Sequence, residues 1–323
     1  MPRKYIRFNY FAINLVPEGL PENMAGRNLS AAWDMRPLLD YLSVRANLIQ
    51  AEINVGIYIA EFDRNTVIYD DRTNLYSFQL SKLRETNIPF LKSIGTPRED
   101  INLAENQYIG EFVTIVFDPM LYTVGIQSNL YSLNVKQVEE YLTQLRRRFN
   151  TIHNIEDGTP LRVEMQPIID NNKIQTIRNS EIFRKITIKG SDYSADALAE
   201  QGTLNEVSEL IGRANGVNFE LTLSIGSAPK NESLDGETIQ EIIEGFTNIQ
   251  NVHNRPKVEI TAREDIDSPL ELVNLLSPRL TNLISFNVET RVGIGHELIH
   301  DTFVDEYTEP RRTIARVNRP IEE

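Results

Sequence analysis

The chain has 323 residues, of which 33 are Lys or Arg and 46 are Asp or Glu, so its formal charge is −13; it contains no Cys. This length predicts about two domains of roughly 150 residues each. The absence of Cys excludes disulfides, thiolate nucleophiles and Cys-based zinc sites, and it is typical of the reducing cytoplasm, where we expect this protein. No apolar run approaches the ~18 residues of a membrane-spanning helix, and the alternating N-terminal residues do not form the continuous apolar run of a signal peptide.

Most strands are predicted where polar and apolar residues alternate or where β-branched and aromatic residues cluster. They lie at residues 4–15, 53–62, 66–70, 76–83, 112–117, 122–126, 161–169, 182–188, 219–225, 258–261, 283–288 and 298–304. Residues 63–65 (Asp-Arg-Asn) and 118–120 (Asp-Pro-Met) predict hairpin turns, because Asp and Asn tolerate left-handed backbone and Pro favours a turn.

Helices are predicted where apolar residues recur at helical spacing, at residues 33–44, 135–148, 204–211 and 239–246. The clearest is 135–148, where Asn134 and Gln137 form the pattern of a capping box. The mixture predicts an α+β fold of mainly antiparallel sheets with hairpins and a few amphipathic helices, in two domains. We expect an N-terminal α+β domain over residues 1–153, a C-terminal α+β domain over 154–310 and an Arg-rich tail over 311–323.

Charge is distributed unevenly along the chain. Residues 144–190 carry a net charge of +4 and residues 311–323 carry +2, whereas residues 191–310 carry −15. Such asymmetry permits local binding of a polyanion despite the negative total, although solvated faces would give the same pattern. The expected DNA contacts are ten of the basic residues in the positive segments: Arg146, Arg147, Arg148, Arg178, Arg184, Lys185, Lys189, Arg311, Arg312 and Arg316. Equally, the tail could pack on the acidic segment.

His296-Glu297-Leu298-Ile299-His300 matches the H-E-x-x-H pattern of zinc metallopeptidases. On a helix both imidazoles would share one face and hold zinc, while Glu297 would act as the general base. However, Gly293 and Gly295 directly precede the motif, and residues 285–289 alternate like a strand. We therefore favour a strand, a Gly-containing turn and a second strand, which would place the two His about 13 Å apart and too far for one ion. We expect no metal and no cofactor.

The order of elements resembles the RexA-like phage-exclusion proteins and, more distantly, the KwaB component of Kiwa defence. The resemblance is carried by residues 35–42, 55–69, 112–119, 161–168, 183–189, 219–224, 283–290 and 297–301. It implies a fold similar to that of the recombination regulator RdgC and a homodimer that binds DNA without sequence preference. It also implies a membrane protein as effector partner, and a closing hairpin formed by residues 283–290 and 297–301.

The sequence therefore predicts a non-enzymatic DNA-binding protein of phage defence that contacts the phosphate backbone electrostatically. One alternative is a zinc metallopeptidase that uses His296, Glu297 and His300. A further alternative is a protein-interaction module whose acidic lobe, residues 191–310, docks a basic partner.

Overall fold

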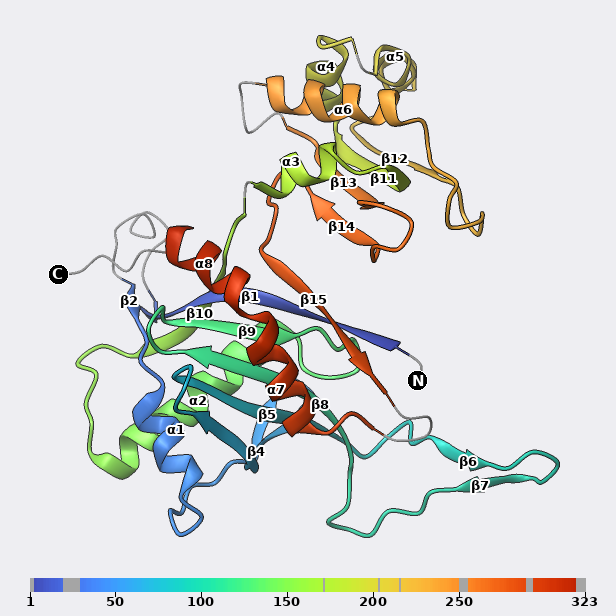
Figure 1. Cartoon of the computed structure of the whole chain (residues 1–323). Coiled ribbons are helices and arrows are strands. Elements are labelled where there is room, and N and C mark those ends of the chain that lie inside the picture. The colour runs from blue at the N-terminus through green and yellow to red at the C-terminus, as the bar shows by residue number, and fades with distance from the viewer. Residues whose placement is uncertain are drawn as a thin grey trace. The chain divides into compact units, whose positions relative to one another are not determined.

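The computed structural model describes residues 3–19, 30–170, 172–202, 204–214, 216–249, 255–288 and 293–317. These residues form a mixed α+β fold with mostly antiparallel sheets and eight helices, which confirms the predicted fold class (Figure 1). The chain divides into two compact units. Unit 1 comprises residues 1–168 and 281–323, and unit 2 comprises residues 169–280.

Unit 1 is built on one curled sheet, a half-barrel whose strands follow the order β10-β1-β9-β8-β5-β4-β3. Its strands are β1 (Arg3–Pro17), β2 (Ala31–Ala32), β3 (Ile53–Val55), β4 (Tyr58–Asp70), β5 (Leu75–Arg84), β8 (Ile109–Asp118), β9 (Thr123–Gln127), β10 (Leu161–Pro167) and β15 (Thr281–Asn287). The first half of the long β1 pairs with β15 and its second half pairs with β10. A separate hairpin, β6 (Phe90–Lys92) and β7 (Arg98–Asp100), extends away from this sheet (Figure 1).

Helices cover both faces of the unit 1 sheet. Along β1, Phe11 and Ile13 point into a core with α1 (Arg36–Ser43) and α2 (Val135–His153). Because side chains alternate along a strand, Phe8 points to the opposite face. There the centroid of its ring lies 4.7 Å from the ring centroid of Phe303. Phe303 belongs to α7 (His296–Glu306), which is followed by α8 (Thr308–Val317).

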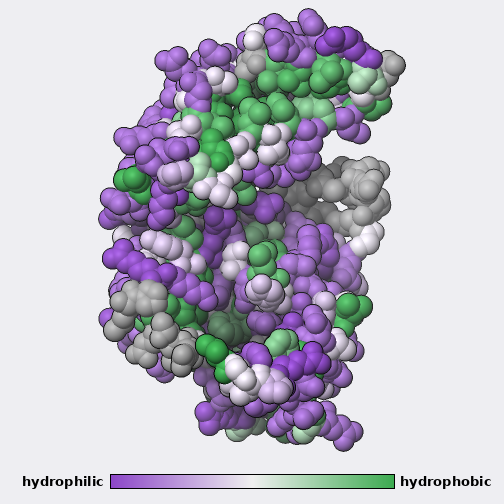
Figure 2. Space-filling view, turned by 90° about the vertical axis from the view of Figure 1, so that its right-hand side faces the viewer, coloured by the Kyte–Doolittle hydropathy of each residue, from purple (hydrophilic) through white to green (hydrophobic). Residues whose placement is uncertain are grey.

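Unit 2 is inserted in the chain between β10 and β15, two strands that both pair with β1. Its sheet has the order β12-β11-β13-β14, and apolar residues of the strands pack on helices in a second core. The elements are α3 (Asn172–Arg178), β11 (Ile182–Ser191), α4 (Asp192–Ala199), α5 (Asn205–Arg213), β12 (Asn218–Ser224), α6 (Gly236–Asn248), β13 (Lys257–Arg263) and β14 (Glu271–Asn274). Figure 2 shows one face of unit 2, on which hydrophobic residues gather in a broad patch.

These compact units differ from the domain ranges expected from the sequence. The polar stretch after residue 153 is the loop between α2 and β10, and Asn154 ends α2 in a left-handed conformation with φ 53°. Both elements belong to unit 1, because β10 pairs with β1 and packs on α2. Residues 311–317 are part of α8 rather than a separate tail. None of the helices in the described ranges combines the length and the hydropathy needed to cross a membrane.

Candidate functional site

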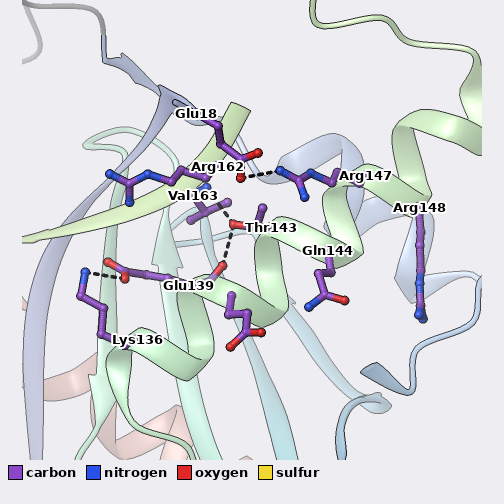
Figure 3. Close-up of a pocket in the computed structure, with 10 residues that line it drawn as sticks. Glu18, Lys136, Glu139, Thr143, Gln144, Arg147, Arg148, Arg162 and Val163 are labelled. Carbon is purple, nitrogen blue, oxygen red and sulfur yellow. Dashed lines mark hydrogen bonds and ion pairs between the residues drawn. The ribbon is translucent and has the colours of Figure 1, made fainter. Parts of the chain in front are cut away.

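An open pocket of about 610 Å³ lies on unit 1 where α2 meets β10. We call it the α2–β10 pocket (Figure 3). Its lining combines four basic side chains with three carboxylates and three uncharged residues: Lys136, Arg147, Arg148, Arg162, Glu18, Glu139, Glu140, Thr143, Gln144 and Val163. Basic side chains that reach one opening from a helix and a neighbouring strand can meet an anion from two sides.

The floor of the pocket is held by hydrogen bonds between α2 and β10. The backbone N–H of Met165 donates to the carboxylate of Glu139 over 2.7 Å, and that of Val163 donates to Thr143 Oγ1 over 2.9 Å. The start of α2 carries the predicted capping box, in which Asn134 accepts from the Gln137 N–H and the Gln137 side chain accepts from the Asn134 N–H. The helix that presents the basic residues is therefore fixed at its start and along its length.

Three of the four basic residues form ion pairs in which the basic side chain itself is exposed. The Nη2 of Arg147 lies 2.6 Å from Oε1 of Glu18, and the Nζ of Lys136 lies 2.8 Å from Oε2 of Glu139. On β10, the Nη2 of Arg162 lies 2.6 Å from Oε2 of Glu164. These three basic side chains are 45%, 79% and 43% exposed, respectively. Surface ion pairs contribute only ~0–1 kcal/mol, so an incoming anion can replace Glu18 at Arg147 or Glu164 at Arg162 at low cost, whereas Glu139 is buried.

The three consecutive Arg of α2 have three different environments. Arg146 is buried and forms two parallel hydrogen bonds with Asp157; these bonds hold the pKa of that carboxyl below its usual range. Arg147 reaches the pocket, whereas Arg148 lines it while donating to the carbonyl oxygens of Gln50 and Glu52. The structure therefore gives Arg146 a structural contact and leaves the other two at the surface.

The expected contacts in unit 2 lie on two elements, Arg178 on α3 and the other three on β11. Arg178 donates to Thr247 Oγ1, and Arg184 donates to four backbone carbonyls of the loop at residues 226–232. Lys185 and Lys189 share one face of β11, and Lys185 is exposed. The Nζ of Lys189 lies 2.8 Å from Oε1 of Glu220 on the neighbouring strand β12. Because Arg184 holds a loop, the lysines are the more accessible of these groups.

The C-terminal Arg residues also divide between structural and exposed positions. Arg311 pairs with Asp118, whose side chain is 1% exposed, and also donates to the Thr73 carbonyl. Burial raises the pKa of Asp118, while the charge of Arg311 opposes that rise. Arg312 pairs with Glu309 on the surface, and Arg316 is exposed.

The predicted strand over residues 298–304 is wrong, and so is the closing hairpin at 297–301, because His296–Glu306 is the helix α7. Gly295 is its N-cap, so the two Gly precede the helix instead of interrupting it. Ile299, Phe303 and Tyr307 are buried at helical spacing against the sheet. Burial of this stripe favours a helix over the strand that local β-propensity suggests.

His296 and His300 share one face of α7, and both rings reach Ser77 of β5. Ser77 Oγ lies 2.8 Å from His300 Nδ1 and 3.3 Å from His296 Nε2. Burial, together with the nearby His300, lowers the pKa of His296 to about 4. Burial also lowers the pKa of His300. Both imidazoles are therefore neutral at pH 7.

These side chains fit the zinc metallopeptidase hypothesis only in part. The helix brings the two imidazoles to one face, as that hypothesis requires, but Glu297 is exposed to solvent. In the part of the chain that the structure describes, no group of three His, Cys, Asp or Glu is placed to hold a metal ion. The rings instead hydrogen-bond a Ser whose side chain is fully buried.

Sequence reasoning found Arg147 and Arg148 but missed the other residues of the α2–β10 pocket. The predicted helix already places four of the lining residues on one face, because they recur every three or four residues: Lys136, Glu140, Gln144 and Arg147. Arg162 lies on β10, and only the pairing of that strand beside α2 brings it to the pocket.

Comparison with known proteins gives one result. The model of a family of unknown function, DUF6731, matches residues 1–317. No curated protein matches the chain.

Proposed function

The chain belongs to the DUF6731 family, and we propose that it binds DNA without sequence preference through the basic residues of the α2–β10 pocket. The observation that carries this proposal is that four basic side chains, Lys136, Arg147, Arg148 and Arg162, line one open pocket. The proposed setting, phage exclusion in the cytoplasm with a homodimer and a membrane-protein effector, rests on the sequence resemblance to RexA-like proteins.

Exchange of ion-pair partners is the proposed mechanism. A backbone phosphate would displace Glu18 from Arg147 and Glu164 from Arg162, because exposed ion pairs are weak and the guanidinium fork matches phosphate as well as carboxylate. Lys136 would add a point charge at the rim of the pocket. Contacts of this type read the phosphate backbone and carry no base information, which supports binding without sequence preference.

The pocket residues replace part of the contact set expected from the sequence. Arg146 is buried, Arg311 pairs with the buried Asp118, and Arg184 donates to four backbone carbonyls, so we assign these three to folding. Lys185 and Lys189 stay in the proposal as a second patch on unit 2, and Arg316 stays as an exposed basic residue of α8.

The carboxylates of the pocket limit the proposed affinity. Glu18, Glu139 and Glu140 line the same opening and repel a phosphate unless their charge is balanced by the basic residues. We therefore expect binding that is strong at low salt and falls steeply towards physiological salt, as counterion release requires.

Fluorescence anisotropy with labelled duplex DNA of two unrelated sequences tests the proposal. We expect equal affinity for both sequences, and a loss on the order of tenfold or more at ~50 mM salt in the double variant Arg147→Ala and Arg162→Ala. The matched control changes Arg72 and Arg98 to Ala, two exposed, ion-paired Arg of unit 1 that do not line the pocket. Equal losses in the two double variants would refute the assignment to the pocket.

A further inference from the structure

A second, more enclosed pocket lies within unit 2, between α3 and the strands β13 and β14. Its volume is about 140 Å³, equal to about four or five water molecules at ~30 Å³ each. Its polar lining consists of two basic residues, two carboxylates and three hydroxyl residues: Arg263, Lys173, Glu264, Glu271, Thr176, Ser180 and Ser268. It shares no residue with the α2–β10 pocket.

Arg263, at the end of β13, is the unusual member of this lining. Its side chain is buried, with the residue 9% exposed, and its Nη1 donates to the Ile266 carbonyl over 3.2 Å. Its Nε is buried without a hydrogen-bond partner among the described residues, and none of their carboxylates lies within 4 Å of the guanidinium. A buried charge without a counter-charge is destabilising, because desolvation is not offset by a partner.

The two carboxylates of the pocket do not remove this imbalance. Glu271 is engaged with Lys173, whose Nζ lies 3.5 Å from Glu271 Oε2. Glu264 is exposed to solvent, and its backbone carbonyl accepts from the Glu181 N–H. The guanidinium of Arg263 therefore remains the uncompensated charge beside the cavity.

We propose that this pocket binds one phosphate-sized oxyanion, with the guanidinium of Arg263 as its central positive charge. An oxyanion beside this guanidinium supplies the missing negative charge, and a guanidinium presents two parallel donors to such a group. The hydroxyls of Thr176, Ser180 and Ser268 are the neutral donors available at the lining. The volume accommodates the oxyanion alone, so the rest of an organic phosphate would extend through the opening.

Isothermal titration calorimetry on the full chain tests the proposal, with inorganic phosphate and AMP as the two probes at constant ionic strength. We expect saturable binding of at least one probe, and a loss of at least tenfold in affinity in Arg263→Met. The control variant Arg213→Met makes the same change at an exposed position of α5 and should bind like the wild type. AMP binding more tightly than phosphate would identify an organic phosphomonoester as the ligand class.

Arg263→Lys keeps the charge but removes the guanidinium fork, and it provides a second test if Arg263→Met does not fold. It should bind phosphate more weakly than the wild type. Absence of binding by both probes overturns the proposal, and so does unchanged binding in the folded Arg263 variants. The double variant at Arg147 and Arg162 should retain phosphate binding at this pocket, so failure of one proposal is distinguishable from failure of the other.

Discussion

Arg311 Nε lies 2.8 Å from the Oδ2 of Asp118, a carboxylate whose side chain is 1% exposed. The Tyr307 hydroxyl donates to the same carboxylate over 3.2 Å. Together these contacts attach α8 to the end of β8, although about 190 residues separate the two in the chain. An Arg that the charge pattern assigns to DNA thus fixes the C-terminal helices on the sheet.

Arg311→Ala should lower the free energy of unfolding by about 2–3 kcal/mol. Removing one partner leaves Asp118 buried and unpaired, but the cost is below the ~3–5 kcal/mol of a fully buried pair because the Arg311 side chain is 33% exposed. Urea denaturation measures the change. Arg312→Ala is the control, because Arg312 forms an exposed pair with Glu309, and its effect should stay within about 0.5 kcal/mol. Similar losses in both variants would contradict the role of the buried pair.

Stability should fall as pH decreases from 7 to 5 through the two His of α7. Their pKa values are lower in the folded chain than the ordinary 6.5, so the unfolded chain binds more protons in this range. The stabilisation is fully present above pH 6.5 and is lost towards about pH 4. Because His296 is partly exposed, we expect a loss on the order of 1 kcal/mol.

Urea midpoints at the two pH values measure this loss in the wild type and in the double variant His296→Gln and His300→Gln. The variant should lose less stability between pH 7 and 5, while His153→Gln, at an exposed position near the end of α2, should behave like the wild type. Four nearby charged residues also affect the pKa values of these imidazoles, but all three proteins contain them: Asp63, Asp70, Asp301 and Arg72. An equal pH response in the double variant and the wild type would rule out the His pair as its source.

Purified protein should not bind zinc stoichiometrically. His296 and His300 direct ring nitrogens to Ser77, and Glu297 is exposed, so the described residues offer two imidazoles without a third protein ligand of the usual type. Elemental analysis after dialysis against micromolar zinc measures the content. One zinc per chain that disappears in His300→Ala would instead support the metallopeptidase alternative.

Asn134→Ala should lower the free energy of unfolding by about 1 kcal/mol, because it leaves the N–H of Gln137 without its cap. Asn134→Ser should retain most of the stability, since Ser is also a good N-cap residue. Thermal denaturation measures both variants. Equal stability of Asn134→Ala and the wild type would show that the capping box contributes nothing to α2.

Local turn and capping signals in the sequence predicted part of the fold. Asn134 caps α2, and the turn at residues 118–120 connects β8 and β9, with Tyr122 at φ 48°. The hairpin predicted around residues 63–65 is wrong, because these residues lie inside β4 where its pairing with β5 is irregular. The turn between β3 and β4 lies at Gly56, whose φ of 60° favours Gly.

Tertiary pairing determined what the local pattern could not. The α7 helix is selected by burial of Phe303 against the sheet, where Gly125 allows the ring to approach within 3.1 Å of the position of a Cβ. In the same way, Arg147 was visible in a basic run, but its partner Glu18 lies in the turn after β1, and Arg162 reaches the same pocket from β10. Charge counting identifies basic residues, whereas only the fold separates those that are exposed from those that are buried.

The salt dependence of DNA binding tests the central claim most directly. If Lys136, Arg147, Arg148 and Arg162 each neutralise one phosphate, the slope of log K against log salt concentration should be about −3 to −4 for duplex DNA, since each contact contributes about −0.9. The double variant Arg147→Ala and Arg162→Ala should lower the steepness of that slope by about two contacts. A wild-type affinity independent of salt, or a slope that is unchanged in the double variant, would contradict phosphate binding at the α2–β10 pocket.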